Sequence, residues 1–376
     1  MVTDRINGER LLADLHRLRE FGATGTGVVR PTFSASDMAA RGWLRDRMAE
    51  AGLESCIDGV GNVFGRSPNP GPTLLIGSHS DTQPEGGWLD GAMGVIYGIE
   101  IARALLENPE TAHLSIDAVA WSDEEGTYSS CLGSSGFVDG LTGDDFAARN
   151  AAGESVAEAL ERTGLSGVDR INLNTDRHVG YLEAHIEQGP HLEAANRRIG
   201  VVSSIVGIRS ARVTFVGSQN HAGTTPMPLR SDAAVAMFHF GSLLQTKMAE
   251  VAGPNSVWTV GVVSVEPGAE SIIPGRAQIT IQFRDPAEQT LEAMNQVILD
   301  LAASVNGDRG VSVLASPLRE KIPPTIMDPQ LITHLRSAAS ERVPDAWIDM
   351  PSAAGHDPMV LSHHLPCGML FIPSIG

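Results

Sequence analysis

A short glycine-rich segment combines imidazole and carboxylate side chains directly after an apolar stretch. The segment GSHSDTQPEGGWLDGAMGV covers residues 77–95 and follows the apolar residues TLLI. Two later apolar stretches end in a similar way, in AVAWSDEEG and in EAHIEQG. The side chains that the three segments supply are His79, Asp81, Asp90, Asp123, Glu124, Glu125, His185 and Glu187. Imidazole and carboxylate groups together suit a divalent ion such as Zn²⁺.

These side chains meet only if the three apolar stretches are strands of one sheet. In α/β sheets, sites form beyond the carboxyl ends of the strands, and glycine-rich turns let short polar side chains converge there. Several carboxylates allow two metal ions, because one bridging aspartate can serve both. Taken alone, each segment also fits an acidic turn or a surface loop. The recurrence at successive strand ends favours the metal site.

The first half of the chain alternates between strands and helices. Residues 36–52 start with Ser36 as a helix cap, carry apolar residues on one stripe and stop at Gly52, which predicts an amphipathic helix. The apolar stretches at residues 73–77 and 115–121 predict strands, and the segment VIYGIEIARALLE between them predicts a helix packed on a sheet. This order predicts a βαβ unit of an α/β fold.

From about Gly207 the sequence changes to an alternation with a period of two. In RAQITIQFRD the apolar side chains share one face, as in a half-exposed antiparallel strand. The order strand, helix, strand, strand, helix, strand predicts a small α+β domain. We therefore expect a discontinuous metal-binding catalytic domain of residues 1–206 and 325–376, interrupted by a domain of residues 207–324.

Composition and charge limit the function classes. The chain has 376 residues, of which 42% are apolar and 19% charged, and a formal net charge of -18. Because 27 basic residues face 45 acidic ones, we expect no nucleic-acid partner. The 3 cysteines are too few for a disulfide framework. A polar N-terminal segment and the lack of a long apolar stretch predict a cytoplasmic protein with a small-molecule substrate and no membrane partner.

The motifs, in their order along the chain, resemble a known family. They include GSHSDTQPEGGWLDGAMGV, WSDEEG, EAHIEQGPHLE, IGVVSSIVG, NHAGTTPMPLRSDA, IIPG, FRDP, AAGHDPMV and FIPSIG. Together they resemble the amidase, hydantoinase and carbamoylase branch of the M20 di-zinc amidohydrolases over nearly the whole chain. That branch includes N-carbamoyl-L-amino acid hydrolases, β-ureidopropionases and allantoate amidohydrolases. The resemblance implies a zinc-aminopeptidase-like catalytic domain with an inserted α+β, ferredoxin-like domain that serves as a lid and dimerisation domain.

The resemblance also implies a role for each residue of the expected metal site. The implied metal ligands are His79, His185, Asp90 and Glu125. The two histidines would bind one ion, Glu125 the other, and Asp90 would bridge both. Glu124 would be the general base, and Asp81 would fix the imidazole tautomer of its neighbour His79. The ions would be Zn²⁺, with Mn²⁺, Co²⁺ or Ni²⁺ as alternatives.

Two backbone features follow for these residues. Adjacent residues on a regular strand point to opposite faces, so Glu124 and Glu125 can serve one site only if the strand ends before them. The resemblance further implies a strained cis peptide bond after Asp90, which Gly91 would tolerate more easily.

The inserted domain and its surroundings would bind the substrate. The resemblance implies that His221 stabilises the oxyanion in the active site of the partner subunit of a homodimer formed through residues 207–324. Arg284 would hold a substrate carboxylate through a bidentate pair. On its own, His221 also fits an ordinary turn histidine and Arg284 an exposed strand arginine.

Other substrate contacts show departures from the family pattern. Gln188 would line the pocket. Ser271, in SIIPG, replaces the usual asparagine, and Ala353 replaces the first glycine of SGAGHD. Gly355, two residues later, would also bind the substrate. Both changes fall at the end of the site that would bind the carboxylate. The resemblance therefore predicts the reaction class more firmly than an α-amino acid product.

The last expectation concerns a further metal ligand. In the family, PSIG continues into GISH, whose histidine completes the second metal site, whereas the sequence above stops at Gly376. We expect a tail carrying this histidine beyond the printed sequence; without it, one metal position would be depleted.

The predicted function is cleavage of an N-carbamoyl or ureido C–N bond in a small carboxylate-bearing substrate. Two alternatives remain open at this point. One is an N-acyl amino acid deacylase or dipeptidase on the same scaffold, and the other is a metal-poor homologue that only binds a ligand.

Overall fold

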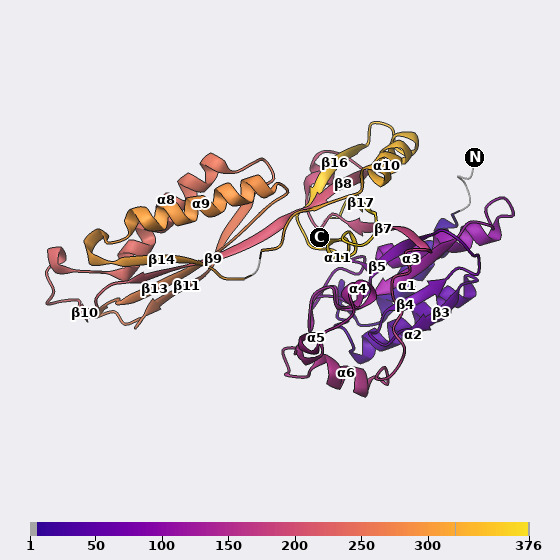
Figure 1. Cartoon of the computed structure of the whole chain (residues 1–376), viewed down its shortest axis with the longest axis horizontal. Coiled ribbons are helices and arrows are strands. Elements are labelled where there is room, and N and C mark those ends of the chain that lie inside the picture. Colours follow the sequence, from indigo (N-terminus) through magenta and orange to yellow (C-terminus); the bar gives the residue numbers. More distant parts are fainter. Residues whose placement is uncertain (1–5, 320, 375–376) are drawn as a thin grey trace. The chain divides into compact units, whose positions relative to one another are not determined.

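The computed structural model describes residues 6–319 and 321–374. The chain divides into two compact units, one made of Met1–Ser203 with Ile326–Gly376 and the other of Ser204–Thr325 (Figure 1). These boundaries lie close to those expected from the sequence. Within the described residues, no helix is both long and apolar enough to cross a membrane.

The first unit is built around a large mixed sheet. Its strand order is β15-β8-β17-β7-β5-β6-β4-β3, with β16 paired to β8. The strands are β3 (Glu54–Ile57), β4 (Val63–Arg66), β5 (Thr73–His79), β6 (Ile116–Trp121), β7 (His178–Ile186), β8 (Ile199–Ile205), β15 (Thr325–Ile326), β16 (Trp347–Ser352) and β17 (Cys367–Ile372). A separate small sheet joins β1 (Ala23–Thr24) and β2 (Gly27–Val28).

The centre of this sheet is parallel. Strand β5 runs parallel to both β6 and β7, and β17 runs parallel to β7. Buried residues occupy most positions of β5 and β6, as expected for strands that are covered on both faces. The carboxyl ends of β5, β6 and β7 therefore lie next to one another at one edge of the sheet, which confirms the α/β prediction.

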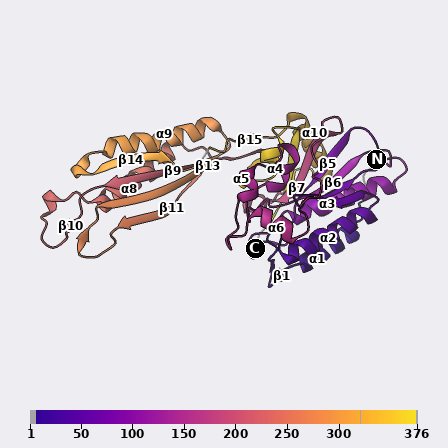
Figure 2. The same ribbon diagram turned by 60° about the horizontal axis from the view of Figure 1, so that its bottom comes forward.

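Helices of the first unit cover the sheet and connect its strands. They are α1 (Gly8–Glu20), α2 (Ala35–Glu50), α3 (Ala92–Glu107), α4 (Leu132–Val138), α5 (Gly143–Ala147), α6 (Val156–Arg162), α7 (His191–Ala194), α10 (Pro329–Arg342) and α11 (Pro358–Leu361). Helices α1, α2 and α3 pack together with β4 and β6 in one apolar core (Figure 2).

The start of α2 differs from the sequence prediction. Its N-cap is Ser34, whose side chain accepts a hydrogen bond from the Asp37 N–H group. Ser36, the expected cap, lies within the first turn and donates its hydroxyl to the Val29 carbonyl. Two serines stand near the helix start, and the backbone takes the extended conformation of a cap at the first of them.

The second unit is an antiparallel sheet with two helices on one face. The strand order is β11-β13-β9-β14, from β9 (Gly207–Val216), β11 (Val257–Glu266), β13 (Arg276–Asp285) and β14 (Ser312–Pro317). Helices α8 (Ala233–Val251) and α9 (Glu288–Val305) pack against each other and against β9 and β13 (Figure 1). This order of elements and strands confirms the expected ferredoxin-like α+β topology.

The predicted alternation in β13 is also present. Ile279, Ile281 and Phe283 are buried in the core under α8 and α9, while the residues between them are partly exposed. Short elements complete this unit: β10 (Asn220–His221), β12 (Ile272–Ile273), and the 3-10 helices η1 (Met227–Leu229) and η2 (Asp308–Gly310).

Candidate metal centre and active site

Two histidines are brought level by neighbouring parallel strands. Ile76 of β5 lies opposite Leu182 of β7. His79, the last residue of β5, and His185, the last but one of β7, are each three residues further on and lie side by side. Strand β6 lies on the other side of β5, and its last residue, Trp121, lies opposite His79. The residues that follow β6 therefore lie at the same edge of the sheet as the two histidines.

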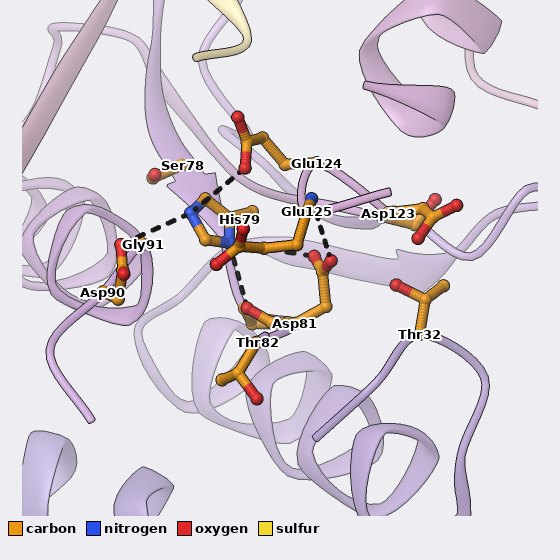
Figure 3. A network of polar contacts seen from close by, with 12 residues as sticks. Thr32, Ser78, His79, Asp81, Thr82, Asp90, Gly91, Asp123, Glu124 and Glu125 are labelled. Carbon is orange, nitrogen blue, oxygen red and sulfur yellow. Dashed lines mark hydrogen bonds and ion pairs between the residues drawn. The ribbon is translucent and has the colours of Figure 1, made fainter. Parts of the chain in front are cut away.

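A carboxylate completes a compact group with the two imidazoles. The Nε2 atom of His185 lies 3.2 Å from Oδ1 of Asp90, and Nε2 of His79 lies 4.0 Å from the same oxygen. The two Nε2 atoms are 3.4 Å apart. All three side chains face one point beside the start of α3, as the close-up shows for His79 and Asp90 (Figure 3).

Hydrogen bonds to the opposite ring nitrogens define which atoms are free to bind a metal. His79 Nδ1 lies 3.0 Å from the Asp81 carbonyl oxygen, and His185 Nδ1 lies 2.9 Å from the Ile186 carbonyl oxygen. A carbonyl only accepts, so each Nδ1 carries a hydrogen, and in the neutral ring, the form that binds a metal, each Nε2 has a lone pair. The Gly91 N–H group, 3.2 Å from His185 Nε2, donates to that lone pair.

This arrangement fits a bound cation. When both rings are neutral, the two Nε2 lone pairs face each other at 3.4 Å and cannot form a hydrogen bond with one another. A divalent ion between them, and beside the Asp90 carboxylate, would convert this repulsion into coordination by ligands that Zn²⁺ prefers. The donor set therefore fits the predicted metal ion.

Two further carboxylates lie beside His79. Glu124 Oε2 is 3.7 Å from His79 Nε2, and ligand atoms of His79, Glu124 and Glu125 all lie within 4.8 Å of one another. Strand β6 ends at Trp121, and Asp123 has a φ of 56°, so the chain turns before the two glutamates. They can both face the site because the regular strand has ended, as the sequence predicts.

Asp81 contacts its neighbours differently from the expectation. Its carboxylate Oδ1 lies 3.8 Å from His79 Nδ1, beyond hydrogen-bond distance, whereas its backbone oxygen is within it. The other carboxylate oxygen accepts the Glu125 N–H group at 3.2 Å, which holds the side chain on that side (Figure 3). The backbone of Asp81 thus defines the tautomer of His79, and its carboxylate holds the turn that carries Glu125.

The charges of the site are strongly unbalanced without a cation. Burial lowers the pKa of His79, but the surrounding carboxylates, Asp81 foremost, outweigh it and raise the pKa to about 9. Burial, together with the charges of Asp357 and Glu125, raises the pKa of Glu124 well above its usual value. Burial also acts to raise the pKa of Asp90, but the contact with His185 holds it well below the usual range. Excess negative charge of this kind attracts a divalent ion, whose own charge lowers the pKa of nearby carboxyl groups.

Gly91 occupies a position that only glycine fits. Its φ is 63°, and the bond after Asp90 is trans, since the cis peptide bond found in the described residues is Glu266–Pro267. The expected cis bond is therefore wrong; the left-handed backbone of Gly91 turns the chain from Asp90 into α3 instead. A Cβ atom on Gly91 would lie 2.4 Å from Nε2 of His79.

Replacing Gly91 with alanine is expected to weaken zinc binding at least about tenfold, because the methyl group would push aside a ligand ring. Zinc titration of the purified variant measures this. Gly143→Ala is the control, since a Cβ atom there meets nothing within 4 Å. Unchanged zinc affinity in Gly91→Ala would show that His79 does not bind the ion in the observed position.

Gln188 also lies at the metal site. Its Nε2 donates to both carboxylate oxygens of Asp90, at 3.1 and 2.9 Å. A cavity of about 690 Å³ is lined by both residues together with Trp88, Leu89 and Pro190. Gln188 thus lines this cavity and also contacts Asp90, an expected metal ligand.

Ala353 and Gly355 lie in the loop between β16 and α11. The next residue, His356, packs its ring against that of His185, with ring centroids 4.5 Å apart. The loop is therefore fastened beside the metal centre within the first unit.

The remaining predicted residues belong to the second unit. His221 is in β10, which pairs with β12 directly after Ser271, and the Ser271 carbonyl accepts the Ala222 N–H group at 2.9 Å. Arg284 lies near the end of β13 and donates to the Gln282 side chain at 3.0 and 3.2 Å. His221 and Ser271 are thus neighbours, and their roles stay predictions.

The structure adds site residues that the sequence reasoning did not single out. Gln83 donates to the Glu125 carboxylate at 2.9 Å. Glu183 is buried, and its carboxylate accepts hydrogen bonds from the hydroxyl groups of Tyr181 and Ser78. One of its carboxylate oxygens lies within 4.8 Å of ring nitrogens of His185 and His356. Glu183 precedes His185 by two residues on one strand, and this same-face spacing was the signal that could have identified it.

Comparison with known proteins agrees with this geometry. The model of Peptidase family M20/M25/M40 matches residues 75–376. An N-carbamoyl-L-amino-acid amidohydrolase of Paenarthrobacter aurescens is 34% identical, over 100% of this chain and 92% of its own. An allantoate amidohydrolase of Bacillus subtilis is 33% identical, over 96% of this chain and 88% of its own.

A solved structure gives the same result for the fold. The amidase of the hydantoinase/carbamoylase family from Burkholderia phymatum is 49% identical with a TM-score of 0.95, and the match covers 99% of this chain and 92% of that chain. The match extends over both units and confirms the resemblance seen in the motifs. The chain therefore belongs to Peptidase family M20/M25/M40 and, within it, to the hydantoinase/carbamoylase group of amidases.

Proposed function

We propose that this protein is a metal-dependent amidohydrolase that cleaves the N-carbamoyl or ureido C–N bond of a small carboxylate-bearing substrate. The observation that carries the proposal is the meeting of two Nε2 lone pairs and the Asp90 carboxylate beside the buried Glu124. Relatives named N-carbamoyl-L-amino-acid amidohydrolase, allantoate amidohydrolase and ureidoglycolate hydrolase support the substrate class.

The ions are held by His79, His185, Asp90 and Glu125 in this proposal, with zinc as the expected metal. When bound, they polarise the substrate carbonyl and lower the pKa of water. Glu124 takes a proton from the attacking water and passes it to the leaving nitrogen. Glu124 lies beside His79, and among the described residues it forms no ion pair with an arginine or lysine. Its carboxylate is therefore available for this transfer.

Binding of the substrate carboxylate is proposed for Arg284. Replacing it with lysine is expected to raise KM more than it lowers kcat, because an ammonium cannot form the planar bidentate pair. The expected rise is about tenfold, corresponding to roughly 1.4 kcal/mol. Steady-state kinetics measures it, with Arg212→Lys on the exposed side of β9 as the control. Equal KM values for the two variants would contradict the assignment.

We further propose that the protein is a homodimer through its second unit. Arg284 lies opposite Ile208 at one end of β9, whereas strand β10, which carries His221, follows the other end, near Arg276. The 10 residues of β9 span about 30 Å, so these two side chains cannot contact one small substrate from a single second unit. A partner subunit that supplies His221 resolves this separation.

The surface of the second unit supports such a dimer. Strand β11 pairs with β13 and has no second neighbour within residues 6–319 and 321–374, so one row of its backbone groups is open to pairing. Val257, Val262 and Val263 on this strand are exposed, as is Phe238 on α8. An edge strand with exposed apolar side chains suits a second copy of the same chain.

A substrate panel tests the proposed reaction. The zinc-loaded protein should release ammonia from N-carbamoyl amino acids, allantoate or ureidoglycolate, and removal of the metal by a chelator should stop the release until zinc is added back. Release of an amine from N-acyl amino acids without ammonia would favour the deacylase alternative. Metal binding with no turnover of any panel member would favour a binding protein.

A further inference from the structure

Two arginines are fully buried behind the metal centre. Arg30 and Arg41 each have a relative exposure of 0%. Arginine is almost never buried to this extent unless its guanidinium group is paired, because removing the charge from water is costly. The hydrogen bonds of these two residues connect them, directly or through neighbouring residues, to the chain segment that follows His79.

Arg30 fastens the residues on both sides of Asp81. Its Nε donates to the Ser80 carbonyl at 2.6 Å. Its own backbone N–H group donates to Thr82 Oγ1 at 2.9 Å, and its carbonyl accepts the Thr82 N–H group at 3.0 Å. The far side of the guanidinium group donates to the carbonyls of Leu18 and Phe21, so α1 anchors the residue. The backbone oxygen of Asp81 that holds His79 therefore lies between two points fixed by Arg30.

Arg41 forms the second part of this support. Its Nε donates to Asp37 at 2.7 Å and its NH1 to the Gly61 carbonyl at 2.6 Å. Asp37 in turn accepts the Phe33 N–H group at 2.8 Å. Burial acts to lower the pKa of Arg41, but the negative charge of Asp37 foremost outweighs it and raises the pKa above its usual value. Through Asp37, Arg41 therefore holds Phe33, which lies three residues after Arg30 in the same segment.

Several buried polar atoms of the group lack a hydrogen-bond partner within the part of the chain that the structure describes. They are Arg30 NH2, Arg41 NH2, Asp37 Oδ1, Ser80 Oγ and Asp81 Oδ1. Leaving such atoms unsatisfied is costly, and the set contains both donors and acceptors. Enclosed water, which typically makes about three hydrogen bonds, is the usual means of linking atoms of this kind.

We propose that Arg30 and Arg41 are positioning residues of the metal centre. Arg30 holds the Ser80–Thr82 segment, whose Asp81 carbonyl orients the ring of His79, and Arg41 with Asp37 holds the segment that carries Arg30. The inference rests on the proposed metal-dependent function. It deepens that function by adding a layer of support behind the ligands. Neither arginine touches the substrate or the metal in this role.

The experiment measures zinc affinity directly, by competition with a chelating indicator, rather than activity. The first variant is Arg30→Lys, which keeps the positive charge but loses the several hydrogen bonds from the guanidinium group to carbonyl oxygens. The second is the double variant Asp37→Leu with Arg41→Met. The pair removes both members of a buried ion pair together, which preserves folding better than removal of one. The control is Arg103→Lys, matched to Arg30→Lys, because Arg103 is also buried and ion-paired, to Asp14 on α1 and Glu100 on α3.

The expected result is a loss of zinc affinity of about 10- to 100-fold in both test variants and no loss in Arg103→Lys. In an Arg30→Lys background the effect of the Asp37→Leu and Arg41→Met pair should largely disappear, because the segment that the pair holds has already lost its contact with Ser80. Equal losses in test and control variants, or losses of the pair that add fully to those of Arg30→Lys, would overturn the inference. Failure of the unmodified protein to bind zinc would instead overturn the proposed function.

Discussion

Replacing Glu124 with glutamine is expected to reduce turnover by at least about 10²- to 10⁴-fold while zinc remains bound. Glu124 is the carboxylate placed to accept a proton, 3.7 Å from His79 Nε2, and the amide of glutamine has no basic oxygen for this step. Its shape is nearly the same, so packing around it should be preserved. Ammonia release under saturating substrate and zinc content per subunit give the two readouts.

The neighbouring residue provides the matched control for this prediction. Glu125→Gln changes the same group by the same chemistry, but Glu125 is proposed as a metal ligand, so this variant should lose zinc as well as activity. A Glu124→Gln protein that keeps its turnover would refute the assigned base. Loss of zinc from it, at a level equal to that of Glu125→Gln, would mean that Glu124 is a ligand instead.

The second large effect is expected from His221→Ala. An imidazole that donates to the oxygen on which negative charge develops contributes about 2.7–4 kcal/mol, so kcat should fall by about 10²- to 10³-fold. His221 is exposed on the short strand β10 of the second unit, and its replacement should leave zinc content and thermal stability unchanged. His239→Ala, at an exposed position of α8, is the control for loss of a surface histidine in the same unit.

Mixing the two inactive variants tests the dimer as well. If His221 serves the partner's site, a mixed dimer of Glu124→Gln and His221→Ala subunits contains one site with both groups intact. After subunit exchange, an equal mixture should recover about a quarter of the activity of the unmodified protein, because half of the dimers are mixed and each has one working site. Absence of any recovery, despite demonstrated exchange, would place His221 in its own subunit's site or outside catalysis.

The sequence was informative where local pattern decides structure. The apolar residues of β5, β6 and β7, each followed by polar ligands, identify strands that end at a common edge. The alternation in β13 identifies a sheet with one covered face, and the βαββαβ order then restricts the topology of the second unit. In these cases the signal is repeated over several neighbouring residues.

Other features depend on contacts between distant segments and left no local signal. Arg30 and Arg41 stand in stretches that read as ordinary polar sequence, yet both are buried by segments far along the chain. The tautomer of His79 is defined by the Asp81 backbone, and a backbone contact is independent of residue type. The absence of a cis bond at Gly91 depends on the way that α3 starts, which a resemblance could not establish.

The place of β17 in the large sheet has a consequence for biosynthesis. This strand lies between β7 and β8, although the whole second unit separates it from them in the chain. A ribosome therefore releases both flanking strands long before the one that joins them. During that interval β7 and β8 each expose an unpaired edge, and such an edge is a template for pairing with other chains until β17 joins the sheet.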